Sequence, residues 1–271
     1  MKKVLKKIFI DGFTGMTQGM FVTLIMGTAF VQIGTWIGGY IGAQFIIFGN
    51  IARLLTGAGI GVGVAAMFGA DSLVTVSAAI TGMLGAFHGL GSAALGNSGE
   101  PLGAFIAAYI AIEIGMLISQ KTSFSLILTP FASILSGALV GYFATPYITR
   151  FIYWIVGLAS YNVAASPIIG GIVVAVLFSL FAVMPLNLPA LAMSLGLSGV
   201  AAGAATIGIC CSMVGFAVSG YRDNKLGGVF AHGFGSAVLQ FPNVLKRPLI
   251  LIPSIISSAI LGPVSYTHLT L

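Results

Sequence analysis

Charged residues are scarce in this chain, and their scarcity excludes a water-soluble protein. Only 11 lysines and arginines and 5 aspartates and glutamates occur among 271 residues. Charged residues make up 6% of the sequence, against about 25% in soluble globular domains. The mean hydropathy is +1.10. So few charges cannot cover a surface that faces water, and we expect the lipid bilayer to be the main partner of the chain.

Residues suited to catalysis or metal binding are also few. Cys210 and Cys211 are adjacent in an apolar stretch, where they cannot readily pair with each other. No cluster of histidine, cysteine and acidic residues has the spacing of a metal site. A nucleophile with a base and a phosphate-binding loop are lacking as well. The sequence therefore predicts no catalytic residue, no cofactor and no metal site.

Long apolar runs are what the sequence does contain. The stretch from Gly12 to Ala52 carries no charge, and a helix needs about 20 apolar residues to cross a bilayer. The runs lack the ten-residue alternation typical of a membrane barrel. The predicted fold is therefore all-α, a polytopic helical bundle with about eight to ten membrane segments, some of them broken or re-entrant. The expected segments are 13–33, a return that ends near Arg53, broken pieces at 56–70 and 72–94, 104–120, 124–144, 151–158, 167–184, 189–218, 226–244 and 249–261.

The first residues, MKKVLKKIF, combine four lysines with apolar side chains. This pattern suits an interfacial helix on the anionic cytoplasmic leaflet. Asp11 and nearby glycines interrupt the apolar stretch, so we expect the segment to be retained and not cleaved as a signal peptide. The positive-inside rule then places the N-terminus, Lys121, the loop 222–225 and the pair 246–247 in the cytoplasm. No nucleic-acid partner is expected, because the net charge of +6 is explained by the membrane surface.

One polar, glycine-rich hexapeptide occurs twice, as HGLGSA at 88–93 and as HGFGSA at 232–237. We expect residues 1–264 to form a single transmembrane domain of two repeat-related halves, about 12–120 and 150–264. Irregular backbone is tolerated at membrane depth only where protein or a cavity covers it. The two elements are therefore expected to be opposed halves of one solute site.

The direction of each copy suggests an inverted repeat. The first copy leads toward the acidic Glu100 and the second toward the basic Lys246 and Arg247. We therefore expect the two copies to enter the membrane from opposite faces, as in transporters built from inverted repeats.

The candidate solute-binding residues are polar groups in or after the two elements, together with one carboxylate inside a span. They are His88, Ser92, Asn97, Glu100, Glu113, His232, Ser236, Gln240 and Asn243. Because an ionised Glu113 in mid-span costs about 3 kcal/mol, it should be protonated, paired or turned toward a cavity. Amides and carboxylates beside histidine suit a polyhydroxy solute. The alternative for each histidine is that it only caps a glycine-broken helix.

Several other residues have simpler expected roles. Glycines four apart, such as Gly15 and Gly19 or Gly59 and Gly63, let helix backbones approach closely in lipid. Asp71 precedes Ser72 and an apolar run, which favours a helix cap.

The stretch 188–263, which includes SLGLSGVAAGAAT and QFPNVLKRP, resembles bacterial membrane proteins described as regulators of the toxin perfringolysin O. The opening KKIFIDGFTGMTQGMF and the segment TGAGIGVGVA share this resemblance. These proteins are grouped with the enzyme IIC components of the phosphoenolpyruvate-dependent sugar phosphotransferase system. The resemblance extends to about residue 263.

The resemblance implies a multi-pass plasma-membrane permease, a homodimer, that binds and translocates a carbohydrate or a related polar solute. In sugar-transporting relatives a histidine and a glutamate contact the sugar, and His88, His232, Glu100 and Glu113 match them by type. The chain lacks a soluble IIB domain, so phosphorylation of the solute would need separate IIA and IIB subunits. The alternative is a membrane sensor that uses the same pocket to control toxin gene expression through a partner.

The last residues, 265–271, depart from this resemblance. They are polar, they follow an abrupt end of the apolar pattern, and they are similar to translated sequencing-adapter sequence. We expect this tail to be non-native and the natural protein to be longer.

Overall fold

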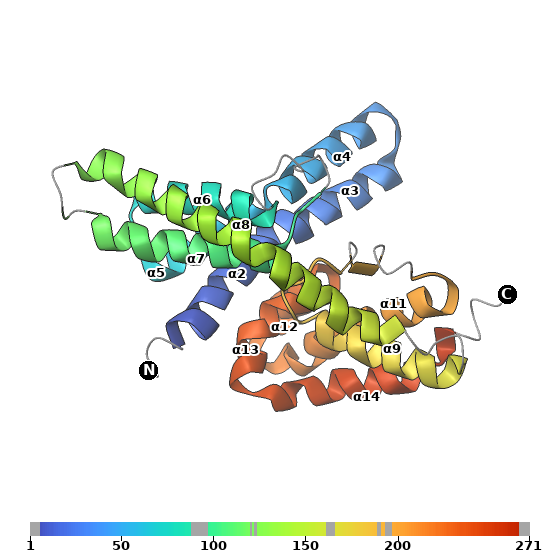
Figure 1. Ribbon diagram of the computed structural model, residues 1–271. Coiled ribbons are helices and arrows are strands. Elements are labelled where there is room, and N and C mark those ends of the chain that lie inside the picture. Colours follow the sequence, from blue (N-terminus) through green and yellow to red (C-terminus); the bar gives the residue numbers. More distant parts are fainter. Residues whose placement is uncertain are drawn as a thin grey trace. The chain divides into compact units, whose positions relative to one another are not determined.

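The described part of the chain is helical and contains no strand (Figure 1). The computed structural model describes residues 6–87, 97–119, 121, 124–160, 166–188, 191–192 and 197–265. Among these described residues, four helices are long and apolar enough to cross a membrane, a bent pair supplies a fifth, and three shorter apolar helices accompany them. Together these are eight membrane segments, which is the lower end of the predicted range of about eight to ten. The all-α, polytopic membrane fold is thereby confirmed.

The chain divides into two compact units, Met1–Thr149 and Arg150–Leu271. The boundary lies where the second repeat-related half is expected to begin. Whether the halves are related as an inverted repeat stays a prediction, and each unit is described by itself below.

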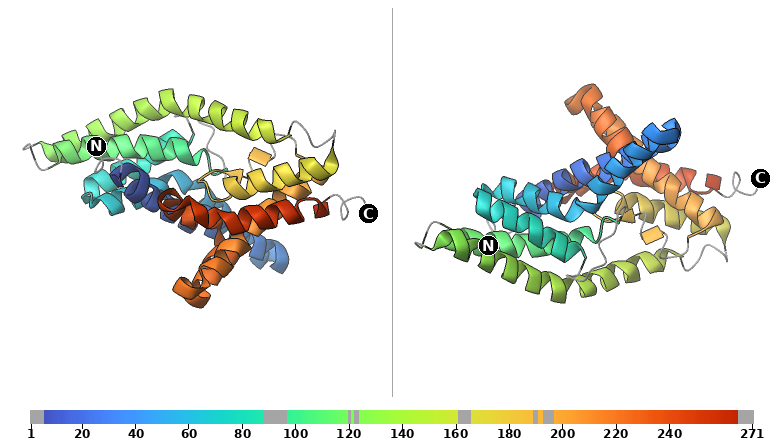
Figure 2. Two further views of the ribbon diagram at one scale, coloured as in Figure 1. Left: turned by 90° about the horizontal axis from the view of Figure 1, so that it is seen from below. Right: turned by 90° about the horizontal axis from the view of Figure 1, so that it is seen from above.

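The first unit begins with a continuous helix, Lys7–Ile37, of 31 residues. It contains α2 (Phe13–Met20) and α3 (Met26–Ile37), preceded and separated by π-helical turns. At 1.5 Å per residue it is about 46 Å long, more than the thickness of the hydrocarbon core. The helix ends at Gly38, whose φ of +67° is readily adopted only by glycine. α4 (Gly39–Leu54) returns beside α3 (Figure 2), as the predicted return near Arg53 requires.

Two short helices follow, as the glycine-broken sequence predicts. α5 (Thr56–Phe68) is bent by 55° from α4, and α6 (Ser72–Ala86) has 15 residues. At about 20 Å and 22 Å, each alone is shorter than the hydrocarbon core. α7 (Pro101–Ile118) is a full span. The three helices pack with α2 around a core that includes the fully buried Met16 and Ile112.

Glycines hold α2 and α5 together at backbone distance. A Cβ atom added at Gly15 would lie 2.4 Å from the carbonyl oxygen of Gly63, and one at Gly19 would lie 2.2 Å from that of Gly59. No real side chain fits at such distances. The predicted packing role of these four glycines is confirmed.

A correction concerns α8. The sequence predicts two segments, 124–144 and 151–158, whereas the structure has one helix, Ser125–Ser160, of 36 residues. Pro130 and Pro146 lie inside this helix. Proline removes one backbone hydrogen bond, but membrane helices tolerate it where neighbouring groups satisfy the freed carbonyl.

In the second unit, α9 (Pro167–Phe181), α11 (Gly199–Ser219) and α14 (Ile252–Leu261) pack on one another (Figure 2). A Cβ atom at Gly208 would lie 2.1 Å from the Ala175 carbonyl oxygen, so α9 and α11 are also in backbone contact. The predicted segment 189–218 is interrupted, because α11 begins at Gly199, and residues 189–190 and 193–196 lie outside the described residues. At Gly199 the φ of +53° marks the break.

The chain between α11 and α14 is the most irregular part of the described structure. α12 (Tyr221–Phe230) leads into a π-helical turn, a short 3₁₀ turn and α13 (Phe241–Lys246). A second 3₁₀ turn, Pro248–Leu251, continues directly into α14. The expectation of a broken piece at 226–244 is thus confirmed.

Candidate functional site

The second hexapeptide forms the break itself. His232 lies in the π-helical turn Ala231–Gly235, and π turns are frequent at functional sites. The chain is extended at Ser236, whose N–H donates to the Ala231 carbonyl oxygen at 2.9 Å. Ser236 Oγ accepts a hydrogen bond from the N–H of Val238 at 3.2 Å. The serine therefore bonds the backbone groups that the break leaves free.

His232 is buried, with 5% of its surface exposed. Its Nδ1 lies 3.3 Å from the carbonyl oxygen of Ser236, and its Nε2 lies 2.8 Å from the side-chain nitrogen of Gln240. The Gln240 side-chain oxygen accepts a hydrogen bond from Asn243 Nδ2, also at 2.8 Å. The four residues predicted from the second element are thus joined in one continuous chain of polar contacts.

Gln240 and Asn243, the outer members of this chain, line a pocket of about 860 Å³, whereas His232 contacts Gln240 without being a lining residue. The volume is within the range of small-molecule sites. The other lining residues are Phe216, Ser219, Gly220, Asp223, Asn224, Lys246, Arg247, Pro248, Leu249, Ile250 and Pro253.

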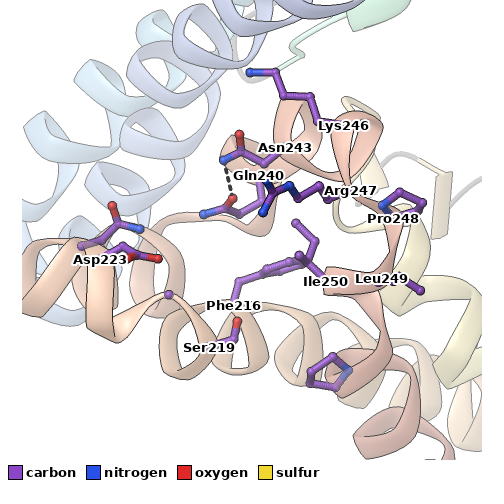
Figure 3. A pocket seen from close by; sticks show the side chains of 13 residues that line it. Phe216, Ser219, Asp223, Gln240, Asn243, Lys246, Arg247, Pro248, Leu249 and Ile250 are labelled. Carbon is purple, nitrogen blue, oxygen red and sulfur yellow. Dashed lines mark hydrogen bonds between the residues drawn. The ribbon is translucent and has the colours of Figure 1, made fainter.

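The pocket has an apolar side and a polar side (Figure 3). Phe216 and Ile250 form part of the apolar wall of the pocket, and Asp223 of α12 lies across from Gln240. The Arg247 side chain extends toward Gln240, while the amine of Lys246 points away from Phe216. Within the described residues the only ion pair is one in the first unit, so the charged side chains at this pocket form no ion pair with one another. Amides, a carboxylate and a guanidinium beside an aromatic ring suit a solute with hydroxyl groups and an apolar face.

The first hexapeptide is not open to the same test, because His88 and Ser92 lie outside the described residues. Of the residues that follow it, Asn97 accepts a hydrogen bond from the N–H of Gly99 at 3.1 Å and so holds a turn. The N–H of Glu100 donates to the Ala86 carbonyl oxygen at 2.9 Å, which fixes the chain just before α7. The prediction that the two elements meet in one central site stays a prediction.

Glu100 lies immediately before the α7 span, with its Oε1 buried and without a hydrogen-bond partner. Burial raises the pKa of this carboxyl from its usual 4.5 to about 7, although the N–H of Leu102 acts in the opposite direction. Desolvation penalises the charged form, which explains the direction of this shift. Glu100 is therefore placed to change its charge near neutral pH.

Glu113 is paired, which is one of the three states expected for it. Its Oε1 lies 2.5 Å from Nζ of Lys7, and about a third of each side chain is exposed. Lys7 Nζ also lies 4.6 Å from the centre of the Phe68 ring. Because these partners already use the carboxylate, its geometry favours a role in holding the first unit together over contact with a solute.

Two expectations about other polar residues can be checked. Asp71 caps α6, since its Oδ1 accepts a hydrogen bond from the N–H of Val74 at 2.9 Å and Oδ2 accepts one from Ser119 Oγ. These two bonds, the one from Ser119 first, lower the pKa of the Asp71 carboxyl. Cys210 and Cys211 are free thiols. In the described ranges no group of histidine, cysteine and acidic residues could hold a metal ion.

Several pocket residues are absent from the sequence-based candidates, namely Phe216, Ser219, Asp223 and Arg247. They come from α11, α12 and the break after α13, so no single motif contains them. One signal was available: 221–225 is one of the longest polar intervals of the chain. The charges there and at 246–247 indicate the topology but do not by themselves point to a pocket.

Comparison with known proteins assigns the chain to a family. A family model described as Phosphotransferase system, EIIC, matches residues 10–270, which includes both units and the whole pocket. No curated protein matches the chain. The chain therefore belongs to the EIIC family of the phosphotransferase system and is an enzyme IIC-like permease of the plasma membrane.

Proposed function

We propose that this permease binds its sugar in the pocket formed by α11, α12, α13 and the turn that begins α14. The observation that carries the proposal is the polar chain from His232 to Asn243, which reaches the surface of a cavity with an apolar side. Hydroxyl groups of a sugar can bond to Gln240 and Asn243, and its apolar face can lie against Phe216. Family membership supports a sugar as the solute and IIA and IIB components as partners.

The charges at the rim support a cytoplasmic opening for this pocket. Lys246 and Arg247 line it, and Arg222 and Lys225 flank the lining residues Asp223 and Asn224. Basic loops resist translocation and stay in the cytoplasm. A sugar held here would be within reach of a separate IIB subunit, which is the expected source of the phosphoryl group.

Finer features of the proposal rest on the sequence. We propose a homodimer with cytoplasmic N-termini, and a single domain of two repeat-related halves in which the first hexapeptide, with His88 and Ser92, completes the site. Membership of the toxin-regulator subgroup is likewise a proposal, based on the resemblance of 188–263. A role in sensing would require that a partner reads the occupied pocket.

The test is a sugar-binding measurement on two matched variants. The purified protein is screened by thermal shift against labelled monosaccharides and disaccharides, and the affinity of the sugar with the largest shift is then measured. Asn243→Ala removes a polar group of the pocket and should weaken binding about 10-fold, the value of one lost hydrogen bond in a site. Gln18→Ala removes an exposed amide in the first unit and should change nothing. Equal affinities in both variants would place the sugar elsewhere.

A further inference from the structure

The contacts of His232 indicate which of its ring nitrogens carries the proton, which its position alone does not show. A neutral imidazole has one nitrogen that donates and one that accepts a hydrogen bond. The Ser236 carbonyl oxygen, 3.3 Å from Nδ1, can only accept, so it requires the proton to be on Nδ1. Nε2 is then the acceptor of the ring. This choice is set by a backbone atom that cannot rotate to offer a donor.

The orientation of the Gln240 amide follows from the tautomer. Nε2 of His232 can only accept, so Gln240 must turn its NH₂ group toward the ring, as the 2.8 Å contact has it. The Gln240 oxygen then lies toward Asn243, which must donate through Nδ2 at 2.8 Å. The Asn243 oxygen is left on the side away from Gln240 (Figure 3). Gln240 therefore has one amide orientation that satisfies both of its neighbours, and Asn243 has one that satisfies Gln240.

We infer that His232 is a positioning residue whose tautomer, fixed by the Ser236 carbonyl, sets the hydrogen-bond polarity of Gln240 and Asn243. The outer end of the chain is thereby a carbonyl oxygen, an acceptor for a solute hydroxyl. This inference rests on the proposed function only in identifying the solute as a sugar. The order of donors and acceptors holds in the empty pocket. It also explains how a buried histidine can affect specificity without touching the solute.

The inference is tested by nitrogen NMR of ¹⁵N-histidine-labelled protein in which His88 and His268 are replaced by Gln, so that the imidazole signals come from His232. At pH 8 the full-length protein should show the Nδ1–H tautomer. Asn243→Asp should move the proton from Nδ1 to Nε2, because a charge-assisted hydrogen bond from the Gln240 amide to the new carboxylate is stronger than the 3.3 Å contact of Nδ1 with the Ser236 carbonyl oxygen. A carboxylate cannot donate to Gln240, so the Gln240 amide must rotate and present its oxygen to the ring. Asn243→Ala removes the side chain without imposing an acceptor and should leave the tautomer unchanged.

A second variant tests the tautomer by a substitution at Gln240, the middle residue of the chain of polar contacts. Gln240→Glu places only acceptors against Nε2 and should likewise favour the Nε2–H tautomer, while Lys246→Ala, which changes a neighbouring charge outside the chain of contacts, should leave the tautomer unchanged. An Nε2–H tautomer in the unsubstituted pocket, or identical spectra for Asn243→Asp and Asn243→Ala, would overturn the inference. These spectra need no solute. If they agree and no sugar binds, the proposed function alone fails.

Discussion

At the scale of single residues, the pair Lys7 and Glu113 shows how the chain accommodates charge within an apolar bundle. The carboxylate is part of α7, and the ammonium comes from the start of the first helix, 106 positions earlier. The ring of Phe68, 4.6 Å from the ammonium, adds a favourable cation–π contact. Exposed fractions of 36% and 32% mean that solvent screens the pair only in part.

Removing one partner should cost more than removing both charges. Lys7→Met leaves the Glu113 carboxylate without its counter-charge and should lower the free energy of unfolding by about 1 to 2 kcal/mol, between the values for exposed and for buried pairs. The double variant Lys7→Met with Glu113→Gln should regain part of that loss. Thermal unfolding of the single and double variants in detergent measures the coupling. Strictly additive effects would mean that the two groups do not interact.

This pair also marks the limit of prediction for single residues. The sequence narrows Glu113 to three states, because an unpaired charge in a span is costly, but it cannot indicate a partner so distant along the chain. His232 is similar. The repeated hexapeptide identifies the residue and its polar neighbours, and the order of the contacts depends on an extended conformation at Ser236 that composition does not reveal. The cap formed by Asp71 could be predicted, because an N-cap depends on the next three residues alone, whereas its bond to Ser119, 48 positions away, could not.

At the scale of elements, glycine contacts fix the distances between helices. In the α3–α4 pair a Cβ atom at Gly34 would lie 2.5 Å from the carbonyl oxygen of Gly42, and one at Gly42 would lie 2.4 Å from that of Gly34. Lipid offers no hydrophobic drive for association, so this close approach is itself the source of attraction.

Gly34→Ala should therefore push α3 away from α4. We expect the free energy of unfolding to fall by about 1 to 3 kcal/mol, the usual cost of overpacking. Gly227→Ala is the matched control, because a Cβ atom at Gly227 meets nothing within 4 Å and alanine favours a helix. Both are measured by thermal unfolding under identical conditions. A destabilisation by Gly227→Ala as large as that by Gly34→Ala would assign the effect to something other than helix packing.

Helix breaks were easier to predict than helix continuity. Glycine and polar residues indicated the short α5 and α6 and the break near 236, since those residues favour irregular backbone. The continuity of α8 could not be predicted, because proline usually ends a helix, whereas within a membrane other backbone and side-chain groups can satisfy the carbonyl that Pro146 leaves free. The start of α11 was missed because 189–198 is as apolar as the helix that follows.

At the scale of the whole molecule, side-chain contacts identify which helix ends of the first unit lie at the same level. Lys7 at the start of the first helix contacts Phe68 at the end of α5 and Glu113 in the second half of α7. Asp71, in the turn between α5 and α6, bonds to Ser119 just after α7. These ends therefore share one side of the membrane. The tip of the α3–α4 pair, with Tyr40 80% exposed, is a full span away.

This arrangement makes the orientation testable. Lys6 and Lys121 lie on the side of the membrane shared by the helix ends near Lys7 and Ser119, and basic residues remain in the cytoplasm. Single cysteines at these positions of a cysteine-free variant should therefore react with an impermeant thiol reagent only after the cells are permeabilised. A cysteine at Tyr40 should react in intact cells, because the 31-residue helix carries it to the outer face. A cysteine at Asn224 reports on the pocket. If the sugar site opens to the cytoplasm, this cysteine should not react with the reagent in intact cells. Labelling of Lys6→Cys in intact cells would invert the orientation, and labelling of Asn224→Cys would place the pocket opening outside.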